Sequence, residues 1–225
     1  MKHADTDPKL QLMQAALAHV PFDGWSPACF EAAIVDCGMD AGLAQAICPR
    51  GAVDLAVAFH QAGDAQMEAL LAKADLGEMR FRDRIAHAVR VRLELCEDKE
   101  VVRRGTSLFA LPHHAATGAQ LIWGTCDAIW TALGDSSDDF NWYSKRATLS
   151  AVYGSTVLFW LGDESVEAEA TWHFLDRRIE NVMQFEKLKS QVSSGPIGKL
   201  LAGPLAVLER VKAPKPAQDV PGRWR

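Results

Sequence analysis

The sequence lacks an apolar run long enough to cross a membrane. The uncharged stretch Ala147–Leu161 spans about four helical turns and contains Gly154, whereas a spanning helix needs about 20 predominantly apolar residues. The first residues, Met1–Asp5, form neither an apolar signal core nor an Arg-rich amphipathic presequence. We therefore expect a cytoplasmic protein.

The sequence also lacks a paired cysteine motif and an excess of basic residues. There are five cysteines, an odd number, and they form no Cys-x-x-Cys motif. Because each lies among apolar residues, we expect small buried thiols in a reducing compartment. The 24 Lys and Arg residues are outnumbered by 29 Asp and Glu residues, so the formal net charge is −5. Nucleic-acid-binding proteins typically have a basic surface, and this composition disfavours one.

Signals for β-strands are absent, because no alternating runs of apolar and polar residues occur. No proline lies between Pro112 and Pro196, so this interval can form long helices. We predict an all-α fold with some nine or ten helices and a disordered tail from Ala213. The predicted helices cover residues 8–19, 27–37, 40–48, 51–72, 80–104, 114–133, 139–161, 165–192 and 197–211.

The first fifty residues have the layout of a helix-turn-helix. Ser26 is a suitable N-cap, with Pro27 at the first helical position. Gly38 ends this helix, and Asp40 caps a second one that stops at Cys48. Because a larger helical body follows, the order of elements suggests the plan of TetR repressors.

The second helix of this unit lacks the chemistry that reads DNA. A recognition helix presents side chains to base edges and phosphates. In this sequence the second helix is Ala-Gly-Leu-Ala-Gln-Ala-Ile-Cys. Gln45 is its only side chain suited to contact a base, and it contains no Lys or Arg. Arg50 follows it alone. We predict a degenerate helix-turn-helix that does not bind nucleic acid.

No catalytic or metal-binding motif is evident. The sequence has no Gly-x-Ser-x-Gly elbow, no strand followed by a glycine-rich phosphate loop, and no Glu-x-x-His pair. The adjacent His113 and His114 point in different directions from a helix, and Asp83 with His87 forms only one pair. We therefore expect no metal, no cofactor and no enzymatic activity.

The predicted helix over 139–161 is apolar on almost every side. A helix at a protein surface has one apolar stripe, but here no charge occurs from Ala147 to Leu161. A strip of small residues, Ala147, Ala151 and Ser155, allows close approach of another helix. The helix is either a central core helix or also lines a cavity for an apolar ligand, with Tyr153 or Thr156 as polar handles.

The segment 196–212 is strongly amphipathic. Apolar residues fall on one face, with Lys199 and Arg210 opposite. Such a helix can lie in a membrane interface, although it is too short to cross a bilayer. Alternatively it packs on the body of the protein. Pro204 is expected to kink it.

Three stretches resemble one family. They are ALPHH at 110–114, DFNWYSKRATLSAVYGSTVLFWLGDES at 139–165 and ATWHFLDRRIENVM at 170–183. They resemble the C-terminal domain of the Coq-nine family, accessory lipid-binding proteins of ubiquinone (coenzyme Q) biosynthesis. The match covers about residues 110–185.

The resemblance implies a TetR-like helical bundle that has lost DNA binding and forms a homodimer. Its implied role is non-catalytic: it presents isoprenoid quinone precursors to a hydroxylase that acts late in the pathway. The hydroxylase-docking patch carried over by position contains Trp142, Tyr143 and Arg146. We predict a lipid pocket between helices 114–133, 139–161 and 165–192, with walls formed by Trp130, Leu149, Val152, Tyr153, Thr156, Trp160 and Leu175.

The resemblance also implies that the terminal amphipathic helix contacts a membrane. The contact residues are then Ile197, Leu200, Leu201, Leu205 and Leu208. From the resemblance we expect a bacterial protein that lies peripherally at the inner face of the cytoplasmic membrane. We divide the chain into a helix-turn-helix-like region (1–75), a ligand-binding and dimerisation body (76–192), the membrane-contact helix (193–212) and the tail (213–225). The alternatives are a TetR-like ligand-responsive transcriptional regulator and an enzyme acting on ubiquinone intermediates.

Overall fold

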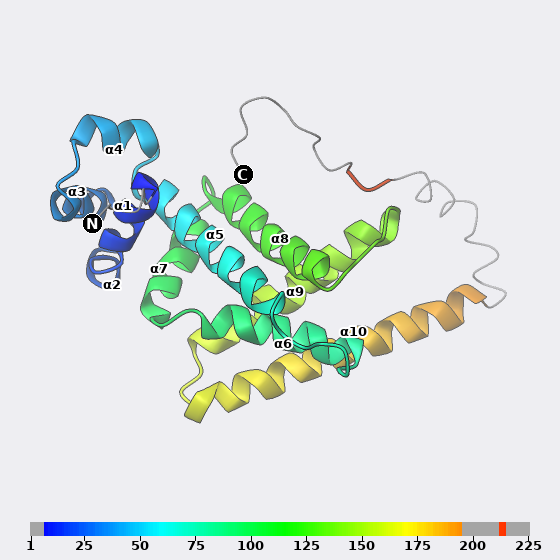
Figure 1. The fold of residues 1–225 in the computed structure, drawn as a ribbon. Coiled ribbons are helices and arrows are strands. Elements are labelled where there is room, and N and C mark those ends of the chain that lie inside the picture. The colour runs from blue at the N-terminus through cyan, green and yellow to red at the C-terminus, as the bar shows by residue number, and fades with distance from the viewer. Residues whose placement is uncertain (1–6, 195–211, 215–225) are drawn as a thin grey trace.

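The computed structural model describes residues 7–194 and 212–214, with side chains as far as residue 184 in the first range (Figure 1). Within these residues all regular structure is helical, which confirms the predicted all-α class. The predicted helix 197–211 and its membrane-contact residues lie outside the described residues. The elements are α1 (Pro8–Ala16), α2 (Val20–Asp23), α3 (Pro27–Cys37), α4 (Ala41–Ile47), α5 (Ala52–Leu71), α6 (Phe81–Glu94), α7 (Lys99–Phe109), α8 (Ala115–Ala132), α9 (Phe140–Leu161), the 3-10 helix η1 (Val166–Ala168) and α10 (Glu169–Ser194).

Local capping fixes the helix-turn-helix, as predicted. The Ser26 hydroxyl accepts a hydrogen bond from the Cys29 amide at the start of α3. Gly38 ends the helix with φ 58°, a left-handed conformation that glycine adopts without steric cost. The Asp40 carboxylate then accepts from the Leu43 amide and begins α4.

The prediction of one helix over 80–104 is wrong. The chain forms α6 and α7, separated by residues 95–98. The Asp98 carboxylate accepts a hydrogen bond from the Glu100 amide, so it caps a new helix. This break turns α7 back toward α2 and α8, with which it packs.

The hydrophobic core has two clusters that share α5. One cluster joins α1–α4 to the first half of α5 and includes Val101 from α7. The other begins at Met67 near the end of α5 and joins α6, α8, α9 and α10. The predicted boundary at residue 75 therefore follows a helix that connects the two cores.

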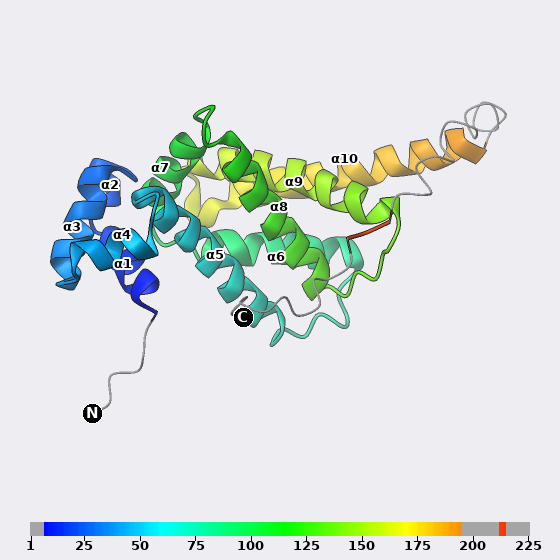
Figure 2. The same ribbon diagram turned by 90° about the horizontal axis from the view of Figure 1, so that it is seen from above.

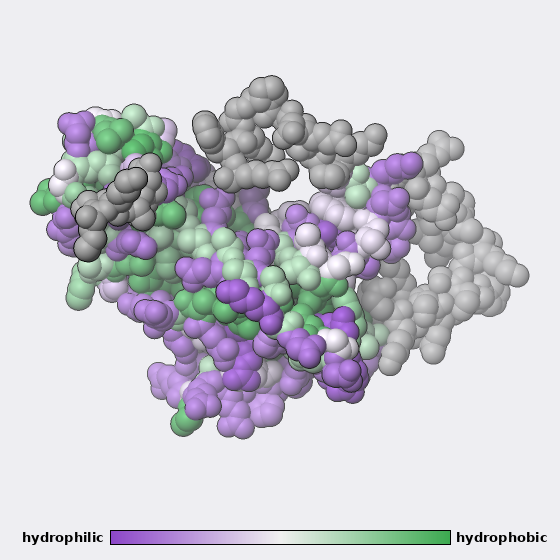
Figure 3. Space-filling view, in the orientation of Figure 1, coloured by the Kyte–Doolittle hydropathy of each residue, from purple (hydrophilic) through white to green (hydrophobic). Residues whose placement is uncertain are grey.

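Helix α9 lies in the centre of the larger body. It packs against α8 on one side and α10 on the other, while α1–α4 form a separate end of the molecule (Figures 1 and 2). In the space-filling view, apolar side chains gather across the middle of one face, and the lower edge is mostly hydrophilic (Figure 3). No helix among the described residues is long and apolar enough to span a membrane.

Candidate functional site

A cavity of about 740 Å³ lies between α6, α8, α9 and α10. Its interior is largely apolar, and the Phe81 and Trp130 rings lie 5.5 Å apart in its wall. The lining residues are Arg80, Phe81, Arg82, Ile85, Trp130, Asn141, Ser144, Lys145, Thr148, Leu149, Val152, Ile179, Glu180, Val182 and Met183.

Charged side chains surround this first cavity. The Arg82 guanidinium donates to the Glu180 carboxylate at 2.8 Å and so joins α6 to α10. The Lys145 ammonium lies 5.1 Å from the Trp130 ring centroid. An apolar interior with a few fixed polar groups is typical of a small-molecule site.

The structure divides the predicted pocket residues. Trp130, Leu149 and Val152 line the first cavity. The prediction missed the wall that α6 provides, including Ile85. It did place the helix over 165–192 beside the pocket, but α10 lines the cavity through residues such as Ile179 and not through Leu175. The many charged residues of α6 are typical of a solvated helix, but its apolar residues recur at i, i+4 spacing, which is a signal for one buried side.

The other four predicted wall residues lie elsewhere. Tyr153 lines a second cavity, which shares no lining residue with the first. Trp160 lines a shallower hollow beside Lys99. Thr156 is fully buried, and its hydroxyl donates to the Val152 carbonyl at 2.7 Å. Leu175 is 2% exposed, and it lines neither cavity.

An aromatic patch lies at the start of α9. The Trp142 and Tyr143 rings are 4.8 Å apart and meet edge to face. Trp123 of α8, which the sequence analysis did not single out, joins them at 5.9 and 6.5 Å. All three are partly exposed. The Tyr143 hydroxyl donates to the Lys212 carbonyl at 3.3 Å, so the chain after the terminal segment returns to this patch.

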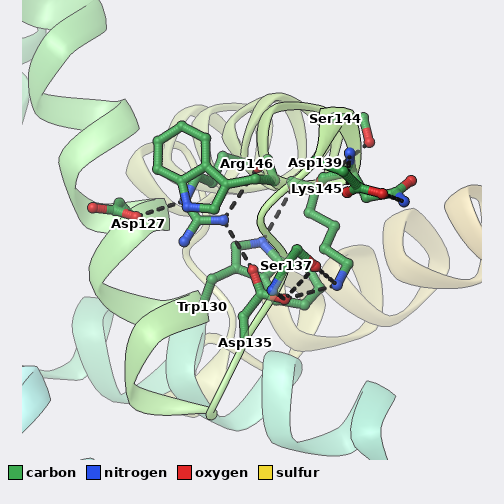
Figure 4. A network of polar contacts seen from close by, with 10 residues as sticks. Asp127, Trp130, Asp135, Ser137, Asp139, Ser144, Lys145 and Arg146 are labelled. Atoms are coloured by element: carbon green, nitrogen blue, oxygen red, sulfur yellow. Dashed lines mark hydrogen bonds and ion pairs between the residues drawn. The ribbon is translucent and has the colours of Figure 1, made fainter. Parts of the chain in front are cut away.

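Arg146 was expected on the surface of the same patch, but it is only 2% exposed. Its guanidinium donates to Asp127 at 2.6 Å and to Asp135 at 3.0 Å (Figure 4). It also lies 4.0 Å from the Trp142 ring centroid, in the range of a cation–π contact. Arg146 therefore packs against the Trp142 ring and holds it in position.

The Asp135 carboxylate is the centre of this network. Besides Arg146, it accepts a hydrogen bond from Lys145 at 2.7 Å and from the Ser137 hydroxyl at 2.8 Å. Burial by itself raises the pKa of Asp135, but hydrogen bonds from Lys145, Arg146 and Ser137 outweigh it and lower the pKa to about 2. The carboxylate is therefore ionised at neutral pH, and it orders the chain between α8 and α9.

The helix-turn-helix presents few groups that could contact DNA. The Gln45 amide donates back to the Pro49 carbonyl at 3.0 Å. Arg50 pairs with Asp54 at 2.7 Å. Across the described part of the chain, no three His, Cys, Asp or Glu side chains are grouped so as to hold a metal ion.

Comparison with known proteins finds one family along most of the chain. The COQ9 family model matches residues 115–186. The chain is 30% identical over 192 residues to the protein named ubiquinone biosynthesis protein COQ9, mitochondrial, of Homo sapiens. It is 31% identical to the proteins of that name from Rattus norvegicus and Drosophila melanogaster. The matches cover 81–82% of this chain and 57–61% of these relatives, so the chain spans about three fifths of their length.

The fold is shared with a solved regulator. A crystal structure of the TetR transcriptional regulator from Nitrosomonas europaea aligns with a TM-score of 0.63 at 18% sequence identity, covering 77% of this chain and 97% of that chain. At this identity the likeness shows the fold alone, and it agrees with the predicted TetR-like bundle. Since the family model and relatives from several animals match the same residues, the chain belongs to the COQ9 family.

Proposed function

We propose that this protein acts in ubiquinone biosynthesis as a non-catalytic, lipid-binding accessory protein. In this proposal it binds an isoprenoid quinone precursor in the first cavity and presents it to a hydroxylase of the pathway. One observation carries the proposal: the first two turns of α9 contribute both to the cavity, through Asn141, Ser144 and Lys145, and to the aromatic patch, through Trp142 and Tyr143. A bound lipid would lie within one helix diameter of a docked partner.

The size and lining of the first cavity suit a lipid. Its volume of about 740 Å³ is within the range of roughly 300–1,000 Å³ found for small-molecule sites. Side chains such as Leu149, Val152 and Ile179 form its apolar walls. Burial of an apolar chain there would provide the main driving force for binding.

The aromatic patch suits a protein partner. Tryptophan and tyrosine often dominate binding energy because they bury a large area with few rotamers. The ion pairs of Arg146 with Asp135 and Asp127 hold the Trp142 ring from below. We therefore assign docking to Trp123, Trp142 and Tyr143, with Arg146 as a positioning residue.

The homodimer remains part of the proposal. Ala147 and Ala151 are exposed on the outer face of α9. Farther along the helix, Leu158 is 61% exposed and Phe159 37%. A helix face with small residues and exposed apolar side chains permits close packing with a second copy, as the two-fold plan requires.

Membrane contact by residues 193–212 is a proposal from the sequence. Just after this segment, the Ala213 amide donates to the Asp138 carbonyl at 2.9 Å. The segment is thus attached at one end to α10 and at the other to the start of α9. Both helices line the first cavity, so a membrane-bound segment would hold the cavity near its lipid source.

A transcriptional regulator is the second candidate, favoured by the TetR-like fold. The intramolecular bonds of Gln45 and Arg50 oppose it, because they occupy the groups that would contact DNA. A gel shift with genomic fragments separates the two functions. Sequence-specific retardation would support the regulator.

Native mass spectrometry of the purified protein, with extraction of co-purifying lipid, tests the proposal. Thr148→Trp fills the first cavity and should abolish lipid retention, while Ser155→Trp, which lies outside both cavities, should retain it. Trp142→Lys should abolish capture of the hydroxylase and leave lipid retention unchanged. Equal lipid retention by the parent and Thr148→Trp would refute the assignment of the cavity.

A further inference from the structure

The second cavity has a volume of about 480 Å³ and lies between α5, α6, α7, α8 and α9. Most of its wall is apolar, with aromatic and aliphatic side chains such as Phe59, Phe109, Ile122 and Val157. It shares no lining residue with the first cavity. A ligand bound here would occupy a separate site, and this inference does not depend on the proposed function.

One wall of the second cavity is polar and buried. The Arg92 side chain, 4% exposed, lines the cavity. Its Nε donates to the Asp64 carboxylate at 2.7 Å, its Nη2 to the His60 carbonyl at 3.0 Å, and its Nη1 to the Cys96 sulfur at 3.4 Å. A guanidinium carries five N–H donors, so two remain beyond these contacts.

The backbone makes room for this guanidinium. A Cβ atom at Gly63 would lie 2.7 Å from the Arg92 Cζ and 2.8 Å from both terminal nitrogens. Glycine in the middle of a helix is less favourable for helix stability than alanine. Gly63 therefore lowers the stability of α5, but it leaves the space in which the Arg92 guanidinium packs against this helix.

The polar wall carries no net charge. The positive charge of Arg92 is balanced by Asp64, which also accepts from the Thr125 hydroxyl at 2.9 Å. The His60 Nε2 lies 2.8 Å from the same hydroxyl. Burial lowers the pKa of His60 to about 4, so its ring is neutral at pH 7.

Tyr153 adds a hydrogen-bonding group without a protein partner. It is 3% exposed and lines the second cavity. Among the residues described by the structure, none forms a hydrogen bond with its hydroxyl. Buried tyrosine hydroxyls usually have a partner, and here the open space beside the ring is the cavity.

We propose that the second cavity binds a single-chain lipid whose head is an uncharged oxygen acceptor, such as a ketone or an alcohol. The head accepts hydrogen bonds from Tyr153 and Arg92, and the chain lies along the apolar wall. A carboxylate head is disfavoured because Asp64 already neutralises Arg92. Such a head would bring an uncompensated negative charge into a buried site beside another carboxylate.

Isothermal titration with 2-decanone and decanoate, two lipids of matched chain length, tests this charge selectivity. The parent protein should bind the ketone at least about ten-fold more tightly than the carboxylate. Asp64→Asn removes the negative partner of Arg92 and should reverse the preference. Equal or tighter binding of decanoate by the parent would overturn the proposal.

Two further variants keep the test decisive if Asp64→Asn does not fold. Tyr153→Phe removes only the hydroxyl and should weaken ketone binding by roughly two- to ten-fold. Gly154→Leu should abolish binding, because its side chain enters the second cavity, where a Cβ has space at 3.9 Å from Ile122. Thr148→Trp fills only the first cavity and should leave ketone binding unchanged. Loss of binding in Thr148→Trp, or no loss in Tyr153→Phe, would refute the site.

Discussion

Replacing Arg146 by Met removes the central cation of the network at the start of α9. Its pair with Asp127 contributes little, since that carboxylate is 44% exposed and such pairs are worth about 0.2–1 kcal/mol. Its pair with Asp135 joins side chains that are 2% and 3% exposed, and removal of one partner of a buried pair costs about 3–5 kcal/mol. Lys145 still contacts Asp135 at 2.7 Å. This remaining contact places the expected cost at the lower end of that range.

The loss of the cation–π contact with Trp142 adds about 0.5–1 kcal/mol. We therefore expect Arg146→Met to lower the free energy of unfolding by about 3–4 kcal/mol, a large part of the roughly 5–15 kcal/mol typical of a domain. Urea denaturation followed by far-UV circular dichroism measures this change. Arg80→Met is the matched control: its pair with Asp83 is on the surface, with Arg80 76% exposed, and its loss should leave the free energy of unfolding nearly unchanged.

A double-mutant cycle with Asp135→Asn isolates the buried pair. The two substitutions together should destabilise the protein by about 1–3 kcal/mol less than the sum of the single changes, because each alone leaves the other group without its partner. Additive effects would refute the assigned role of the pair. The same conclusion would follow if Arg146→Met and Arg80→Met had equal effects.

Three further predictions concern pH, assembly and membranes. The unfolded chain protonates His60 near pH 6.5, but the folded protein does so only near pH 4. Neutral His60 therefore costs the folded protein no stability above pH 6.5, and the free energy of unfolding should fall by about 2 kcal/mol between pH 7 and pH 5. Urea titrations should show a smaller fall in His60→Gln. An unchanged fall would contradict the buried, neutral state of His60. Ser155→Trp places a large side chain on the small-residue face of α9 and should shift the dimer to monomer in sedimentation velocity; a parent that is already monomeric at micromolar concentration would disprove the proposed dimer. Leu201→Glu with Leu205→Glu puts two charges on the apolar face of the terminal segment and should prevent sedimentation with anionic liposomes. Parental binding by this variant and by a truncation before Pro196 would leave the segment without a membrane role.

Features that depend on neighbouring residues could be predicted from the sequence. The Ser26 and Asp40 caps and the left-handed Gly38 are local, because each involves residues within a few positions along the chain. The long interval without proline likewise permitted α8, α9 and α10. Family membership was also evident from the Asn-Trp-Tyr motif of α9 and its spacing from the Thr-Trp motif of α10.

Tertiary structure decided which side of α9 each residue occupies. When a helix is apolar on every side, its sequence has no periodicity that separates the residues of a cavity wall from those of the core. The sequence therefore predicted one pocket for Leu149 and Tyr153, but the two residues line different cavities. The sequence analysis expected Arg146 at the surface. Its buried partner Asp135 lies in the loop before α9, outside the helical pattern of α9 itself. The first cavity also needs α6 and α10, whose residues Arg82 and Glu180 pair across 98 positions. Contacts over such distances depend on how the helices pack, and no local pattern encodes them.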